Sequence, residues 1–265
     1  MTLAARNITL GYKSKYIIES TNIKINTGEI TTLIGGNGSG KSTLLKALSG
    51  ILMPIEGDIY LDNKPLNKWP AKQLAQNLSL LPQHPIAPEN ITVEQLVSHG
   101  RYPYQGLLAP VSKEDKEAIK WAIDATNLSA LKNRDFNSLS GGERQRGWIA
   151  LALAQKAKYL LLDEPTTYLD IGHQLEVLDL LRKLNQDIGL TLIMVLHDVN
   201  QASQYSDRLL AMKNGKIIAD DKPIKVLTTE LLHSLFAIES EIILRHENFK
   251  TFPYSIPIRA AKRCV

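Results

Sequence analysis

Three short runs of apolar and β-branched residues stand out along the chain, at 30–34, 159–162 and 191–196. Runs of this length without alternating polar positions are typical of parallel strands that are covered on both faces. The first run leads into a glycine-rich segment, the second ends at Asp163 and the third ends at His197. Open α/β sheets bind their ligands at the carboxyl ends of the strands. The pattern therefore predicts an α/β fold with a functional site at that edge.

Between about residues 84 and 139 the apolar positions follow the period of a helix instead. Thr92 and Gln95 have the spacing of a capping box, the hydrogen-bonded start of a helix. Further along, apolar residues recur at helical spacing at Ala118, Trp121, Ala122, Ala125 and Leu128. Joints rich in glycine or proline flank this region at 81–85 and 140–142. The region is therefore predicted to be an inserted helical subdomain.

A chain of 265 residues with 44% apolar residues can form one large domain with a packed core. We expect a single domain over residues 1–230, with a core made of 1–83 and 155–230. The helical subdomain is expected over about 84–154. The remaining residues, 231–265, have room for a helix and one or two strands.

Composition narrows the possible functions. The formal net charge is +4 and no long basic tract is present, so nucleic-acid binding is not expected. The only cysteine is Cys264, so an intrachain disulfide is excluded and a reducing compartment is expected. No signal peptide is evident, and no apolar run approaches the roughly 20 residues of a membrane span. We expect a cytoplasmic protein that would need another chain for any membrane span.

The glycine-rich segment after the first apolar run matches the phosphate-loop pattern G-x-x-x-x-G-K-[ST]. Glycines let backbone N–H groups converge on phosphate oxygens, and the following helix points its positive end at them. Lys41 is expected to reach the β- and γ-phosphates, Ser42 to hold Mg²⁺ and Thr43 to contact the α-phosphate side. The predicted nucleotide-binding residues of the loop are Gly35, Asn37, Gly38, Ser39, Gly40, Lys41, Ser42 and Thr43.

Two adjacent carboxylates, Asp163 and Glu164, follow the second apolar run. Asp163 could hold Mg²⁺ directly or through water, and Glu164 could orient and deprotonate an attacking water, which contributes about 10²–10⁴-fold. Carboxylates at a strand end could instead cap a helix. Pro165 indicates a sharp exit from the strand, and Lys41 upstream favours the catalytic interpretation.

The segment 139–145 reads Leu-Ser-Gly-Gly-Glu-Arg-Gln and predicts the start of a helix. Ser140 and Glu143 have the spacing of a capping box. A capped helix start with two glycines, Gly141 and Gly142, exposes backbone N–H groups and is therefore also an anion site.

In this order and at this distance, the phosphate loop and the segment 139–145 resemble the ATP-binding cassette (ABC) ATPases. The resemblance extends from Thr9 to about Gly215. It implies a P-loop NTPase (RecA-like) core with an N-terminal antiparallel β part and an inserted α-helical subdomain. It also implies ATP hydrolysis, ATP and Mg²⁺ as cofactors, and a second copy of the chain that completes each ATP site.

The resemblance assigns roles to further residues. Gln83 falls at the Q-loop, where it would contact Mg²⁺ and the attacking water, and His197 falls at the switch histidine, where it would contact the γ-phosphate. The residues expected to act on the partner subunit's ATP, in the signature segment and the D-loop, are Ser140, Gly141, Gly142 and Asp170.

Two positions, Gly36 and Tyr168, depart from the family pattern, and the residue that contacts adenine has alternative assignments. Gly36 stands where the family very often has proline, and we expect a small effect. Tyr168 stands in a D-loop that commonly reads Ser-Ala-Leu-Asp, although the Leu-Asp pair is kept. Tyr12 is the candidate to stack on adenine, with Tyr16 as the alternative residue. A core position in a β-hairpin is the further alternative for Tyr12.

A narrower likeness involves the segments 164–171, 173–174 and 196–202, with support from 100–103 and the proline-rich stretch 253–257. These are similar to the ATPases of bacterial ferric-siderophore importers. The likeness implies a subunit that works with a transmembrane permease and, indirectly, a substrate-binding protein, peripheral to the cytoplasmic face of the inner membrane. The alternatives are a haem or vitamin B12 importer, or a soluble assembly ATPase of the iron–sulfur cluster type.

Overall fold

A computed structural model describes residues 2–13, 15–106, 110–247 and 250–261, so the single cysteine, Cys264, lies outside the described residues. The chain divides into two compact units. The first unit consists of Met1–Asn67 and Leu192–Val265, and the second consists of Lys68–Thr191. Each unit is described below by itself.

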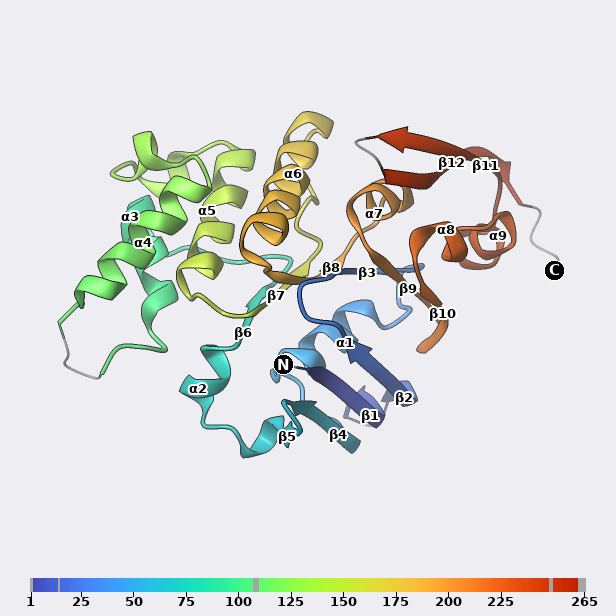
Figure 1. The fold of residues 1–265 in the computed structure, drawn as a ribbon, viewed down its shortest axis with the longest axis horizontal. Helices are drawn as coiled ribbons and strands as arrows, with labels where there is room; N and C mark the ends of the chain where they lie inside the picture. Colours follow the sequence, from blue (N-terminus) through green and yellow to red (C-terminus); the bar gives the residue numbers. More distant parts are fainter. Residues whose placement is uncertain (1, 14, 107–109, 248–249, 262–265) are drawn as a thin grey trace. The chain divides into compact units, whose positions relative to one another are not determined.

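The first unit contains an antiparallel sheet with the strand order β2-β1-β4-β5 and a set of four strands in the order β10-β9-β3-β8 (Figure 1). In the second set β3 lies between two parallel neighbours, β8 and β9, and β10 is antiparallel to β9. The strands are β1 Leu3–Tyr12, β2 Lys15–Ile25, β3 Ile30–Ile34, β4 Glu56–Leu61, β5 Lys64–Pro65, β8 Thr191–Val195, β9 Arg208–Lys213 and β10 Lys216–Asp221.

The core of this unit is built on the apolar runs. All five residues of β3 and all five of β8 are buried, which confirms the prediction of strands covered on both faces. Burying a valine, leucine or isoleucine side chain stabilises the folded state by about 1.5–3 kcal/mol. Strand β3 therefore fixes the start of the glycine-rich segment that follows it.

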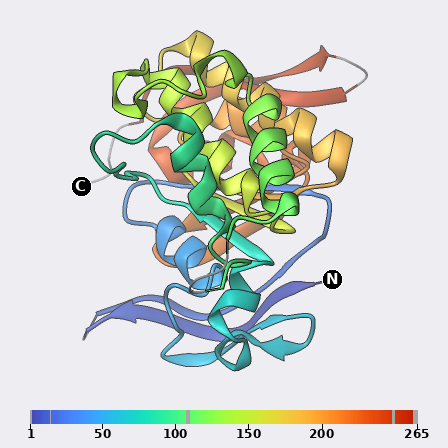
Figure 2. The ribbon, with the colours of Figure 1, turned by 90° about the vertical axis from the view of Figure 1, so that its left-hand side faces the viewer.

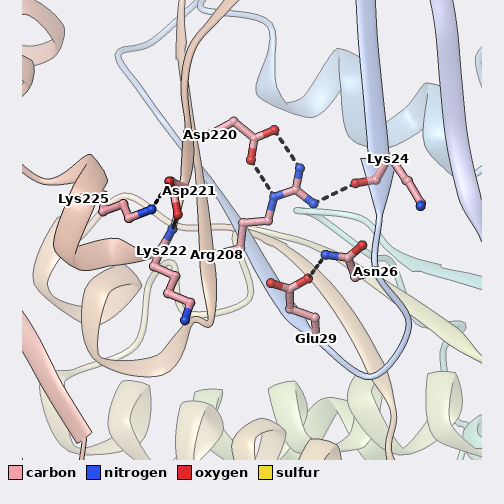
Figure 3. A network of polar contacts seen from close by, with 8 residues as sticks. All are labelled: Lys24, Asn26, Glu29, Arg208, Asp220, Asp221, Lys222 and Lys225. Carbon is pink, nitrogen blue, oxygen red and sulfur yellow. Dashed lines mark hydrogen bonds and ion pairs between the residues drawn. The ribbon is translucent and has the colours of Figure 1, made fainter.

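Arg208 links the strands of this unit (Figure 3). Its guanidinium forms two hydrogen bonds to Asp220 on β10, of 2.5 and 2.6 Å, and Nη1 donates to the Lys24 carbonyl on β2 at 2.7 Å. The paired carboxylate of Asp220 raises the pKa of Arg208. This bidentate geometry fixes the edge formed by β9 and β10 against β2.

Among its described residues, the first unit also contains four helices and a hairpin. The helices are α1 Lys41–Leu48, α7 Val199–Tyr205, α8 Pro223–Val226 and α9 Thr229–Phe236. The hairpin pairs β11, Ile238–Glu247, with β12, Lys250–Ala260. The expectation of a helix and one or two strands at the C-terminus is confirmed.

The second unit contains the parallel pair β6, Leu78–Leu81, and β7, Tyr159–Asp163. Strand β7 is buried at every residue, as its apolar run predicts. The helices are α2 Ala71–Ala75, α3 Val93–Ser98, α4 Lys113–Ala125, α5 Gly141–Ala154 and α6 Ile171–Ile188. Short 3-10 turns lie at His99–Arg101, Ser129–Leu131 and Phe136–Ser138.

Helices α3, α4 and α5 pack side by side (Figures 1 and 2). The capping box of Thr92 and Gln95 is formed, and Ala118 and Ala122 are buried on α4, so the predicted helices are confirmed. The boundaries of the two units differ from those expected for the helical subdomain, about 84–154, which stay a prediction. Among the described helices, none combines the length and the apolar character that crossing a bilayer requires.

Candidate functional site

The phosphate loop closes on its own lysine. Lys41 is buried at the start of α1, and its Nζ donates to the carbonyls of Gly35 and Gly36 at 2.8 and 3.0 Å. The Nζ atom also lies 3.5 Å from the Ser39 hydroxyl. An ammonium held by main-chain oxygens is positioned at the loop itself, where the motif requires a charge for phosphate. Asn37 and Gly38 are exposed at the tip of the loop, while Gly40, Ser42 and Thr43 form the start of α1.

Two glycines of the loop are required by their surroundings. Gly35 has φ +149°, and a Cβ there would lie 2.2 Å from the Met212 carbonyl oxygen on β9. Gly40 has φ +102° and faces the side chain of Ile18 on β2. At Gly35 the main chain therefore runs too close to β9 for a side chain, and at Gly40 the positive φ favours glycine. The amide of Gly215 donates to the Ser39 carbonyl at 3.1 Å, which fixes the other side of the loop.

The second unit brings two predicted catalytic residues together. Asp163 is the buried last residue of β7, and Glu164 follows it in the left-handed region at φ +55°. The side chain of Gln83, just after β6, donates to Glu164 Oε2, and the Thr167 hydroxyl lies 3.2 Å from the same atom. These two donors orient the carboxylate. Sequence reasoning predicted both Gln83 and Glu164, but it did not predict that they are in contact.

The signature segment and the D-loop also meet within this unit. Ser140 caps α5 and forms the predicted capping box with Glu143, whose pKa is lowered by the Ser140 amide. Gly141 is exposed and Gly142 is buried. A Cβ at Gly142 would lie 2.4 Å from the ring of His173, so the start of α5 packs directly against α6.

Asp170 begins α6 as its N-cap. Its Oδ1 accepts from the His173 amide at 2.9 Å, and its Oδ2 lies 2.8 Å from His173 Nδ1. The His173 amide, followed by the His173 ring, lowers the pKa of Asp170. The aspartate of the D-loop is therefore held by the histidine that packs on Gly142, a connection that local spacing could not reveal.

Tyr168, the departure in the D-loop, is 84% exposed and adopts φ +65°. Its ring lies 5.8 Å from the ring of His84, measured between centroids. A tyrosine in the left-handed region is uncommon and costs free energy. The D-loop and the Q-loop are thus in contact through two aromatic side chains.

His197 is exposed and follows β8 at the end of the first unit's buried strands. The next residue, Asp198, is the N-cap of α7, and its Oδ1 accepts from the amides of Asn200 and Gln201 at 2.7 and 3.0 Å. A short strand end and a capped helix therefore fix the main chain on both sides of His197.

Tyr12 and Tyr16 are 45% and 56% exposed, at the end of β1 and near the start of β2. The alternative that Tyr12 is a core residue is therefore wrong. Both rings are available for stacking, and the assignment of Tyr12 to adenine stays a prediction.

A buried ion pair stabilises the helical region of the second unit. Arg101 Nε donates to Asp115 Oδ1 at 2.7 Å, Nη1 donates to the Ala154 carbonyl at 2.7 Å, and the guanidinium lies 3.8 Å from the centre of the Tyr104 ring. Burial alone would raise the pKa of Asp115, but the hydrogen bonds from Arg101 and Ser112 outweigh it and hold the pKa below its ordinary value.

We expect Asp115→Asn to lower the free energy of unfolding at pH 7 by about 1–3 kcal/mol, because a buried charge loses its partner. A carboxylate with a lowered pKa stabilises the fold above its unfolded pKa and loses this contribution as the pH falls through its folded pKa. The difference between wild type and variant should therefore shrink below about pH 4. Urea titrations of both proteins at several pH values measure this difference in the free energy of unfolding.

Glu117→Gln on the same helix is the matched control. Glu117 lies 3.9 Å from Lys113, and both side chains are mostly exposed. Loss of such a surface pair should change the free energy of unfolding by less than about 0.5 kcal/mol. An equal effect of both variants would contradict the importance of the buried pair.

A phosphate loop, an Asp-Glu pair after a buried strand and a capped Ser-Gly-Gly helix start define a P-loop ATPase of the cassette class. The family described as "ABC transporter" matches residues 18–167, and the chain belongs to this family.

Comparison with known proteins gives both relatives and fold neighbours. The chain is 45% identical over 242 residues to the iron(3+)-hydroxamate import ATP-binding protein FhuC of Bacillus subtilis, which covers 91% of this chain and 90% of the relative. A metal-chelate type ABC transporter in an inward-facing conformation matches with a TM-score of 0.84 at 31% identity, over 97% of both chains. The dimeric cassette MJ0796 with ADP and Pi matches with a TM-score of 0.72 at 29% identity, over 83% of this chain and 98% of that chain. The predicted ABC ATPase fold is confirmed.

Proposed function

We propose that this chain is the ATP-hydrolysing subunit of an importer that takes up a ferric siderophore or another iron chelate through a separate membrane permease. The observation that carries the proposal is the contact of Gln83 with Glu164 beside Asp163, together with the phosphate loop closed on Lys41. The names of the hydroxamate-import relative and of the metal-chelate transporter support the class of cargo.

In the proposed reaction Lys41 and the amides of the phosphate loop bind the β- and γ-phosphates of ATP. Glu164 accepts a proton from the water that attacks the γ-phosphorus, and Gln83 and Thr167 hold the carboxylate in place for that transfer. His197 contacts the γ-phosphate and stabilises the charge that develops there.

The residues predicted to hold Mg²⁺ all offer oxygen atoms, the ligands that Mg²⁺ prefers. We assign it to the Ser42 hydroxyl, the Gln83 side chain and the Asp163 carboxylate, following the family pattern. When bound, Mg²⁺ neutralises negative charge on the β- and γ-phosphates.

A second copy of the chain is the proposed partner at the ATP sites, contacted by Ser140, Gly141, Gly142 and Asp170. The dimeric state of MJ0796 supports this arrangement. The exposed residues around the Q-loop and Tyr102 are the proposed contact with the permease; Ile86 is 90% exposed there and Tyr102 is 59% exposed. The protein is then peripheral to the cytoplasmic face of the inner membrane, with a substrate-binding protein acting indirectly.

The function is tested by uptake of radioactive iron, offered as several ferric chelates, in cells that lack this protein. The cells are complemented with the wild type or with Glu164→Gln. We expect uptake of one chelate to return with the wild type and to stay absent with the variant. If no chelate depends on the protein, siderophore import is excluded, and haem, vitamin B12 or an assembly role becomes the better assignment.

A further inference from the structure

The C-terminal hairpin β11–β12 lies along α7, the helix that begins two residues after His197 (Figure 1). The two Asn200 side-chain groups bind both main-chain groups of Ser255: Nδ2 donates to its carbonyl at 3.0 Å, and Oδ1 accepts from its amide at 2.7 Å. The Asn200 amide thus makes the pair of main-chain hydrogen bonds to Ser255 that a neighbouring strand would otherwise make. Since Ser255 is 1% exposed, its main-chain groups need these partners.

The hairpin contacts α7 from the first turn of the helix to its end. One turn after Asn200, the buried hydroxyl of Ser203 donates to the Pro253 carbonyl at 2.7 Å. At the end of the helix, Lys250 Nζ donates to the carbonyls of Gln204 and Ser206 at 2.8 and 2.7 Å. A lysine on the last carbonyls of a helix also complements the helix dipole. Both ends and the middle of α7 are therefore fixed to β12.

The same C-terminal segment reaches the phosphate loop through α9. A Cβ at Gly36 would lie 3.3 Å from the Leu235 carbonyl oxygen, and Lys213 Nζ donates to the Ser234 hydroxyl at 2.9 Å. Gly36 is the position where the family very often has proline. Helix α9 leads directly into β11, so one continuous segment contacts the phosphate loop and the helix after His197.

We propose that the C-terminal hairpin acts as a clamp on α7, in which Asn200 and Ser203 are positioning residues that hold His197 for the hydrolytic step. This inference rests on the role assigned to His197 in the proposed function. His197 directly precedes Asp198, the N-cap of α7. A displacement of α7 would therefore shift the main chain that carries His197, and the contacts of α7 with β12 restrict that displacement. Small misplacements at a reacting centre can cost about 10²-fold in rate.

Asn200→Ala in the full chain is expected to lower the kcat of ATP hydrolysis about 10- to 100-fold, with an unchanged KM for ATP. The chain has six histidines, so the ring proton signals of the imidazoles can be resolved by NMR and that of His197 assigned from His197→Ala. The His197 signal should shift in Asn200→Ala. Ser203→Ala removes one contact instead of two and should change kcat and the signal in the same direction to a smaller extent.

Ser255→Ala is the matched control, because within the described part of the chain the Ser255 hydroxyl is buried without a hydrogen-bond partner and only its main chain contacts Asn200. This variant should keep kcat within about twofold. If folded Asn200→Ala and Ser203→Ala keep the wild-type kcat, or if kcat falls while the His197 signal stays in place, the clamp is refuted. Should Asn200→Ala not fold, Ser203→Ala decides by the same criteria.

His197→Ala, measured in parallel, distinguishes a failure of the role given to His197 from a failure of the clamp alone. If this variant hydrolyses ATP at the wild-type rate, the role given to His197 fails and the clamp fails with it. If it is inactive while the two clamp variants are fully active, the proposed function stands and only the clamp is overturned.

Discussion

Replacing Glu164 by glutamine is expected to lower the rate of ATP hydrolysis by about 10²–10⁴-fold while ATP still binds. The amide cannot accept the proton of the attacking water, but it keeps the size of the side chain next to Gln83 and Thr167. Because ATP binds and is not consumed, the two copies should stay closed around it. Steady-state release of phosphate measures the rate, and size-exclusion chromatography with ATP and Mg²⁺ measures the trapped dimer.

Glu176→Gln is the control for this experiment. Glu176 lies on α6 in the same unit and forms a 2.8 Å ion pair with Arg146, and its side chain is 58% exposed. Its loss should change the rate by no more than about twofold. Hydrolysis by Glu164→Gln at the wild-type rate would exclude Glu164 as the base, whatever its effect on the dimer.

Much of the fold was predictable from the sequence because its signals are local. The buried runs that became β3, β7 and β8, the phosphate loop and the two predicted capping boxes, at Thr92 and Ser140, each depend on residues a few positions apart. Helix α4 and the C-terminal helix with its strands follow from period and length in the same way.

The contacts that connect these elements could not be predicted. Gln83 and Glu164 are 81 positions apart, and Asn200 and Ser255 are 55 apart. Spacing along the chain carries no information about such pairs, because they form only when separate strands and helices pack. The contact of Gly142 with the His173 ring is of the same kind: the sequence shows a glycine, and only the structure shows what a side chain there would displace.

The segment between β7 and α6 contains backbone conformations that residue propensities do not predict. Glu164 and Tyr168 both have positive φ, within a stretch that links β7 to α6. Non-glycine residues in this conformation cost about 1–3 kcal/mol each and persist where the surroundings determine them. Here the surroundings are the hydrogen bonds of Glu164 Oε2 and the His84 ring beside Tyr168. The segment that is predicted to carry the catalytic base and the dimer contact therefore contains two residues whose conformation local propensity does not predict.

Lys41→Met is expected to weaken ATP binding by about 2–5 kcal/mol, or roughly 30- to 4,000-fold in Kd, because a buried cation is removed from the phosphates. The thioether keeps most of the volume of the side chain but cannot donate to Gly35 and Gly36, whose carbonyls accept from Lys41 Nζ. The variant therefore loses both the charge and the contact that closes the loop. Equilibrium binding of a fluorescent ATP analogue measures Kd, and phosphate release measures the accompanying loss of turnover.

Lys46→Met separates the loss at the loop from a general loss of positive charge on α1. Lys46 lies in the last turn of the same helix and is only partly buried, so its replacement should change Kd by no more than about twofold. Because both variants remove one lysine from one helix, the difference between them isolates the phosphate loop. Equal binding by Lys41→Met and wild type would show that the loop does not hold the phosphates through Lys41, and the assignment of this chain's ATP site would have to be abandoned.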